Sequence, residues 1–137
     1  MLSTAMDIST SGLIANRARL DVIAGNLANM STLKNEQGEN QPYQRRFTVL
    51  QTDDQIATQH GAMGVKVASV EIDQSQPSFR YEPHHPLADQ RGYVAYPKVD
   101  MTTEFTNSLI ASRAYEANIG VMETTKNLGQ QTLRILA

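Results

Sequence analysis

The chain has 137 residues, a formal net charge of −2 and no cysteine, and 40% of its residues are hydrophobic. This is about the length of one domain, and the lack of cysteine excludes disulfides, thiolate catalysis and cysteine-ligated zinc. Basic and acidic residues are interspersed, so the sequence lacks the clustered positive charge of a nucleic-acid-binding or membrane-surface protein.

Residues 3–30 are predicted to form one long helix. Its two heptad rows are Met6, Leu13, Leu20 and Leu27, and Ser9, Asn16, Ile23 and Met30. This spacing indicates a seam that packs against another helix, with polar members that set its register. The first residues contain neither a basic nor a continuous apolar region, so no cleavable signal peptide is expected, and no apolar run reaches membrane-spanning length.

The middle of the chain changes from helical to strand-like patterns. Residues 34–42 lack periodicity and are predicted to be a solvated loop. Short strands are predicted over 46–50, 64–72, 78–81 and 93–96. In the second of these, the alternation slips between Val67 and Ala68, which predicts a β-bulge or a strand covered on both sides.

A second long helix is predicted from about Asp100, a suitable N-cap residue, to the end of the chain. Its two heptad rows are Phe105, Ser112, Ile119, Lys126 and Leu133, and Ser108, Tyr115, Met122, Gly129 and Leu136. Glycine, asparagine and threonine lower its helix propensity, so it needs a partner surface. The predicted fold is α+β: two long terminal helices over 1–32 and 100–137, packed as a hairpin or coiled coil, with a small β-rich insertion over 33–99.

Histidines supply the only cluster with metal-ligand chemistry. His84 and His85 are adjacent, Glu82 and Asp89 lie nearby, and His60 is upstream. Neighbouring residues of an extended segment point to opposite faces, so we interpret the pair as loop histidines. No catalytic, cofactor-binding or metal site is predicted, and we expect no enzymatic activity. A soluble metal- or ligand-binding module is the alternative from another functional class.

Segments near both ends of the chain resemble the bacterial flagellar axial proteins, which form rods, hooks and hook-associated structures. These segments are Asn26-Leu27-Ala28-Asn29 with Ser31-Thr32, and Ser112-Arg113-Ala114-Tyr115-Glu116-Ala117-Asn118. Three middle segments and the chain length are similar to a proximal rod subunit of this family: Gly64–Val67, Tyr81–Asp89 and Gly92–Val94. The companion proximal rod subunit, FlgB, is the alternative within the same class.

The resemblance implies a structural subunit of the basal-body rod, which acts as a drive shaft and encloses an export channel. It implies that the terminal helices pack into an inner tube, with the β-rich part outside. The implied partners are other copies of the chain, the rod proteins FliE, FlgB, FlgF and FlgG, and the flagellar type III export apparatus, which would deliver the chain to the periplasm-spanning rod. No cofactor, nucleic acid or membrane span is implied.

The resemblance and the heptad rows together predict an assembly interface on the two helices. Its expected residues are Leu13, Leu20, Ile23, Asn26, Leu27, Asn29, Phe105, Tyr115, Asn118, Ile119, Met122, Leu133 and Leu136.

Overall fold

The computed structural model describes residues 2–136. The elements in chain order are α1 (Leu2–Ala28), β1 (Arg46–Ala57), β2 (Met63–Ile72), β3 (Ser78–Tyr81), β4 (Tyr93–Tyr96) and α2 (Met101–Leu136). The predicted α+β class is confirmed, since two long helices flank a small middle region of antiparallel strands. The outer limits of the two predicted helical segments, Met1 and Ala137, lie outside the described residues.

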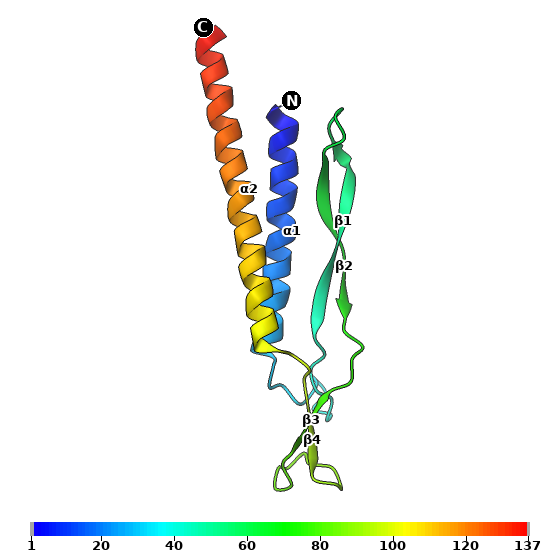
Figure 1. Cartoon of the computed structure of the whole chain (residues 1–137). Coiled ribbons are helices and arrows are strands. Elements are labelled where there is room, and N and C mark those ends of the chain that lie inside the picture. Colours follow the sequence, from blue (N-terminus) through cyan, green and yellow to red (C-terminus); the bar gives the residue numbers. More distant parts are fainter. Residues whose placement is uncertain (1, 137) are drawn as a thin grey trace.

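The elements form three side-by-side layers, with α1 in the centre (Figure 1). α2 runs antiparallel along one side of α1, and the β1–β2 hairpin runs along the other side. The β3–β4 hairpin lies at the end where α1 finishes and α2 begins, which we call the base. Both chain ends lie at the opposite end, where α2 extends beyond the start of α1. Over residues 2–136, no helix combines the length and apolarity needed to cross a bilayer.

α2 begins at the predicted cap. The Oδ2 atom of Asp100 accepts hydrogen bonds from the backbone N–H of Thr103 at 2.9 Å and from its hydroxyl at 2.6 Å. These bonds satisfy a donor that a helix start leaves without an intrahelical partner. They also favour the charged carboxylate, and therefore lower the pKa of Asp100.

The β1–β2 hairpin contains the irregularity that the sequence predicts. Val49 pairs with Ser69 and Leu50 pairs with Val67, so Ala68 is the extra residue of a bulge. β1 continues to Ala57, seven residues past the predicted end at Leu50. Its second half is polar and therefore has no strand-like alternation, although its backbone still pairs with β2.

The seam between the helices is built from smaller residues than the sequence predicts. The buried residues of α1 are Ser9, Ser11, Gly12, Ala15, Ile23 and Asn26, whereas the row Met6, Leu13, Leu20 and Leu27 is only half-buried. Ser9 and Ile23 of the second predicted row are thus buried, while Ser11 faces the β1–β2 hairpin at Val65 rather than α2. A Cβ atom at Gly12 would lie 2.9 Å from the side-chain amide of Asn118, so this glycine permits a close approach of the two helices.

Candidate assembly surface

A buried polar cluster at the base holds three segments together. The Nδ2 atom of Asn26 donates to the carbonyl of Arg46 at 2.8 Å and to Glu104 Oε2 at 3.2 Å. Its Oδ1 atom accepts from the backbone N–H of Arg46 at 2.9 Å and from the Tyr43 hydroxyl at 3.0 Å. Both donors and both acceptor positions of the Asn26 amide are therefore used.

Glu104 supplies the charge of this cluster, and its side chain is fully buried. Its Oε1 atom forms an ion pair with Nε of Arg45, which is partly exposed. Burial raises the pKa of the nearby Tyr43 hydroxyl, the positive charge of Arg46 lowers it, and the carboxylate of Glu104 raises it. We call Asn26, Tyr43, Arg45 and Glu104 the base cluster. It joins α1, the segment before β1 and the first turn of α2.

A second contact fixes the β1–β2 hairpin against α1. The Ser11 hydroxyl donates to the carbonyl of Ile8 at 2.6 Å and accepts from the backbone N–H of Val65 at 3.0 Å. A Cβ atom at Gly64 would lie 3.0 Å from Ser11 Oγ and 3.0 Å from Ile56 Cβ. The hairpin can therefore lie this close to α1 only because residue 64 has no side chain.

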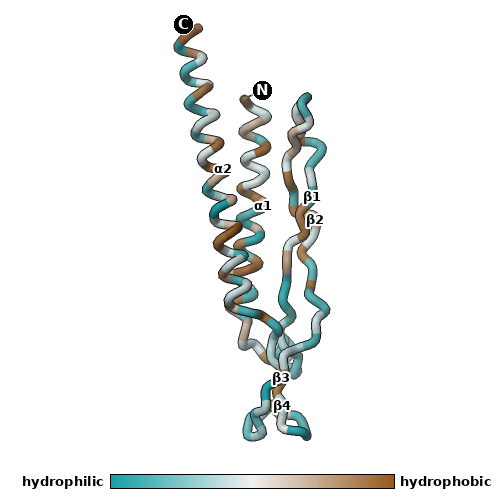
Figure 2. Tube along the Cα trace, in the orientation of Figure 1, coloured by the Kyte–Doolittle hydropathy of each residue, from teal (hydrophilic) through white to brown (hydrophobic). Residues whose placement is uncertain are grey.

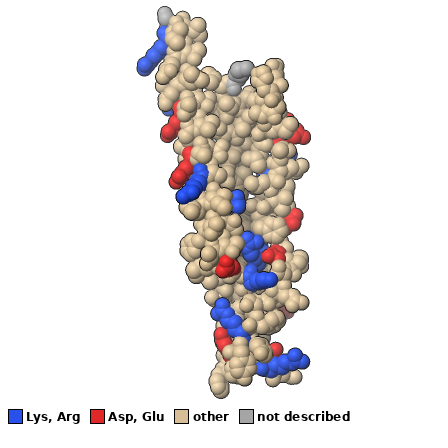
Figure 3. Space-filling view, viewed as in Figure 1, with Lys and Arg blue, Asp and Glu red and all other residues tan. Residues whose placement is uncertain are grey.

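Large apolar side chains of α2 are exposed to water. They include Phe105, Leu109, Ile110, Val121, Leu128, Leu133, Ile135 and Leu136. In Figure 2 hydrophobic segments recur along both helices, and in Figure 3 the charged side chains of the upper half lie mainly along its two edges, so few lie at its centre. Among residues 2–136, only Ala15, Ile23, Val94 and Ala111 are buried hydrophobic residues. Exposed apolar surface of this extent is typical of an interaction site.

The predicted interface residues fall into three groups. Ile23 and Asn26 are buried within the chain; Leu13, Leu20, Leu27, Asn29, Tyr115, Asn118 and Met122 are half-buried; Phe105, Ile119, Leu133 and Leu136 are exposed. Asn118 faces Gly12 and donates to the carbonyl of Ala114 at 2.8 Å. The structure thus places Asn26 and Asn118 in contacts between the subunit's own helices.

Sequence reasoning missed the base cluster apart from Asn26. Glu104 is visible in the sequence only as an acidic residue in the first turn of a helix, where such residues are common. Arg45 and Tyr43 follow an aperiodic loop and carry no pattern of their own. The contacts of Asn26 cross up to 78 positions of sequence, which no local periodicity can reveal.

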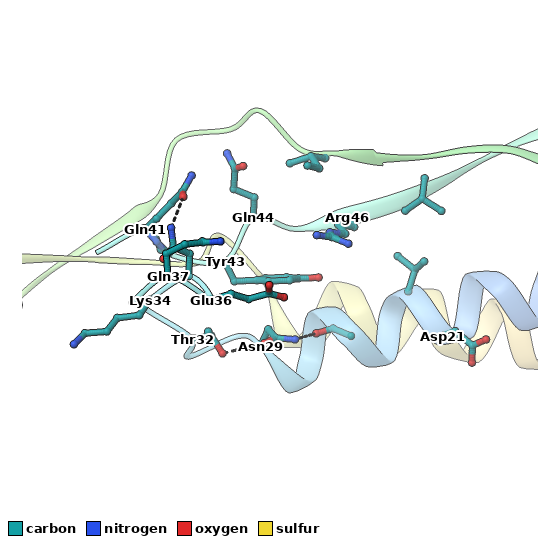
Figure 4. A pocket seen from close by; sticks show the side chains of 16 residues that line it. Asp21, Asn29, Thr32, Lys34, Glu36, Gln37, Gln41, Tyr43, Gln44 and Arg46 are labelled. Carbon is teal, nitrogen blue, oxygen red and sulfur yellow. Dashed lines mark hydrogen bonds between the residues drawn. The ribbon is translucent and has the colours of Figure 1, made fainter. Parts of the chain in front are cut away.

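A large open pocket lies beside the base cluster, between the end of α1 and the loop that follows it (Figure 4). Its volume is about 860 Å³. Asn29 donates to the carbonyl of Gly25 and accepts from the Thr32 hydroxyl, and Tyr43 lies along one wall. Asn29 and Thr32 bond at the turn after α1, whereas Asp21 lies apart from the other labelled side chains, further back along α1.

The histidines do not form a metal centre in the part of the chain that the structure describes. No group of three histidine, aspartate or glutamate side chains comes together there as a set of ligands. The Nδ1 atom of His85 accepts a hydrogen bond from the backbone N–H of Leu87 at 3.1 Å, and His60 and His84 are exposed.

Two protein-family patterns match this chain. The family described as flagella basal body rod protein matches residues 6–33, and the C-terminal family of the flagellar basal body rod proteins FlgEFG matches residues 90–135. These ranges cover most of α1 and of α2, respectively.

Individual relatives are similar over nearly the whole chain. Flagellar basal-body rod protein FlgC of Salmonella typhimurium (strain LT2) is 42% identical over 134 residues, covering 98% of this chain and 97% of that protein. FlgC of Yersinia enterocolitica is 40% identical with the same coverage of both chains. FlgC of Bacillus subtilis (strain 168) is 34% identical over 143 aligned residues, covering 96% of this chain and 95% of the relative.

Proposed function

The chain belongs to the FlgC family of flagellar basal-body rod proteins, and we propose that it forms the proximal part of the rod through the outer faces of its two helices. It is a structural subunit of the basal-body rod, and its named relatives are structural rod proteins. In our proposal the assembled subunits transmit torque as part of a drive shaft and enclose the channel for later export substrates.

The exposed apolar surface of α2 is the observation that carries this proposal. Phe105 is 57% exposed, and other large aliphatic side chains follow it along α2. Burial of apolar surface contributes about 25 cal/mol per Å², so contact with neighbouring subunits stabilises an assembly that covers these side chains. The half-buried row Leu13, Leu20 and Leu27 provides a second apolar strip on α1.

We assign different roles to the three groups of predicted interface residues. The exposed group contacts neighbouring subunits directly. The half-buried group is shared between the intrachain seam and neighbouring subunits. Ile23 and Asn26 act from inside the subunit, because they keep the two helices in the relative position that presents the other residues.

The proposed partners follow from family membership. They are other copies of this chain, the rod proteins FliE, FlgB, FlgF and FlgG, and the flagellar type III export apparatus. We propose that the chain passes through this apparatus unfolded and is incorporated into a rod that spans the periplasm. The division into an axial helical part, residues 1–32 with 100–137, and an outer β-rich part, residues 33–99, belongs to the same proposal.

The substitution Phe105→Asp tests the function directly. The side chain is mostly exposed and an acidic residue suits the first turns of a helix, so the free energy of unfolding of the isolated subunit should change by less than about 0.5 kcal/mol. Cells whose only copy carries this variant should lack complete rods and fail to swim. Asn127→Asp, which adds the same charge at another exposed position of α2, is the control and should swim. Normal rods with Phe105→Asp would contradict the proposal.

A further inference from the structure

Within residues 2–136, the last two turns of α2 have no partner helix. At Gly129 a Cβ atom would lie 3.4 Å from Leu2 Cδ1, at the start of α1, and the residues beyond Gly129 extend past that end (Figure 1). We call residues 130–136 the overhang. Leu133 is 69% exposed and Leu136 is 79% exposed. They lie four and seven residues after Gly129, so they continue the side of α2 that packs on α1.

A groove with a mixed polar and apolar lining lies at the same end of the molecule, between the first half of α1 and the β1–β2 hairpin. Its volume is about 680 Å³. Ile14, Ile56, Val65 and Val67 are among its lining residues, and Ile14 is 65% exposed. We call this the upper groove. Its apolar lining residues can pack against an incoming helix that has no partner helix of its own.

We propose that the overhang of one subunit occupies the upper groove of a second copy of this chain. This contact rests on the proposed function and specifies how its copies join. The overhang carries a single charged residue, Arg134. The upper groove includes Asp7, Asp53 and Lys66, and its formal charge is therefore −1. Lys66 and Asp53 pair with each other at 3.6 Å, so Asp7 carries the net charge of the groove. A positive segment with exposed leucines thus meets a groove of opposite sign that also has apolar lining residues, which favours this occupant over a neutral or acidic helix.

The position of the two surfaces determines the kind of assembly. The overhang belongs to α2, on one side of α1, whereas the upper groove lies on the side that carries the β1–β2 hairpin. The contact therefore joins two different surfaces. A heterologous contact of this kind leaves one overhang and one groove unused at the ends, so it propagates from copy to copy into a ring or a helical array.

A disulfide between the two surfaces tests this contact, and the natural chain contains no cysteine that would interfere. The test variant carries Ile14→Cys with Leu136→Cys, expressed as the only copy in swimming cells. Within one subunit these residues cannot bond. Gly12 faces Asn118, and Leu136 lies 18 residues further along α2 (136 − 118), roughly 27 Å away, whereas a disulfide requires Cα atoms within about 7 Å.

The control pair is Ala24→Cys with Leu136→Cys, because Ala24 is exposed on α1 but does not line the groove. Oxidised basal bodies should give a ladder of subunit multiples with the test pair and none with the control pair. Complete rods with no ladder from the test pair would overturn this contact but leave the proposed function intact. A ladder of equal strength from the control pair, or a cross-link to a partner of another size, would also overturn it. Failure of the unmodified chain to enter basal bodies would overturn the proposed function itself.

Discussion

The two ends of the helical hairpin differ in how completely they are packed. At the base, α1 and α2 meet around the fully buried Asn26 and Glu104, whose hydrogen bonds and ion pair are completed within one chain. At the other end, Leu133, Ile135 and Leu136 are 69–84% exposed and have no helix beside them. A subunit can therefore be specific and folded at its base while apolar side chains stay uncovered at its opposite end.

This difference has an energetic reason. A buried polar group needs its partners in place, since an unpaired donor or acceptor costs about 1–3 kcal/mol, so the base cluster permits few alternative arrangements. An exposed leucine imposes no such requirement and can be covered by any complementary apolar surface. Substitutions at the base should therefore affect folding of the subunit, whereas substitutions at the overhang should affect assembly.

The largest expected effect on folding is that of Glu104→Ala. It leaves the side chains of Arg45 and Asn26 without their carboxylate partner, and the loss of one member of a buried ion pair costs about 3–5 kcal/mol. Urea denaturation of the purified chain measures this change. Glu116→Ala, at an exposed position of α2, should change the free energy of unfolding by less than about 0.5 kcal/mol. Equal effects of the two substitutions would show that the base cluster does not stabilise the fold.

Gly64→Ala should have the next largest effect. The added methyl group would lie 3.0 Å from both Ile56 Cβ and Ser11 Oγ, and the β-branched Ile56 cannot rotate its Cβ away. Crowding of this kind costs about 1–3 kcal/mol. The matched control is Gly120→Ala, where an added Cβ would meet no side chain or other segment within 4 Å. The free energy of unfolding should there rise by about 0.5–1 kcal/mol. The two changes in the free energy of unfolding should thus have opposite signs, and a stabilised Gly64→Ala variant would contradict the close contact between hairpin and α1.

These same sites show why the sequence predicts some features and not others. The N-cap at Asp100 depends on residues close in sequence, so a local pattern predicts it correctly. The slip in alternation after Val67 predicts a bulge as one of two alternatives, and the pairing with β1 shows that bulge at Ala68. The seam depends on Gly12 meeting Asn118, 106 positions away (118 − 12), and small residues carry no hydrophobic signal. The apolar periodicity therefore identifies two helices that pack together, but it assigns their central contact to leucines that are only half-buried.

A smaller effect is expected for Asp100→Asn, and it should depend on pH. The bonds from Thr103 hold the pKa of Asp100 in the folded chain below that of an unfolded aspartate, about 3.9. The charged cap therefore stabilises the folded chain above about pH 4, and this contribution is lost as the pH falls through the lower pKa of the folded state. Asparagine accepts the same hydrogen bonds without ionising. The difference in melting temperature between wild type and Asp100→Asn should shrink as the pH is lowered from 6 to 2, and a constant difference would exclude this role for the Asp100 charge.

The smallest effect on the isolated subunit is expected for Leu133→Asp, together with a severe effect on the rod. The Leu133 side chain is 69% exposed, so the free energy of unfolding should change by less than about 0.5 kcal/mol. In an assembly that covers residue 133, the same substitution buries an unpaired carboxylate, which costs several kcal/mol. Cells should therefore produce a folded protein but few complete rods, measured by basal-body isolation and swimming assays. Asn127→Asp adds the same charge six residues earlier, at an exposed position of α2 outside the overhang, and should swim normally. If cells with Leu133→Asp also swim normally, the overhang is not part of the interface. The exposure of apolar side chains at that end would then not indicate where subunits join.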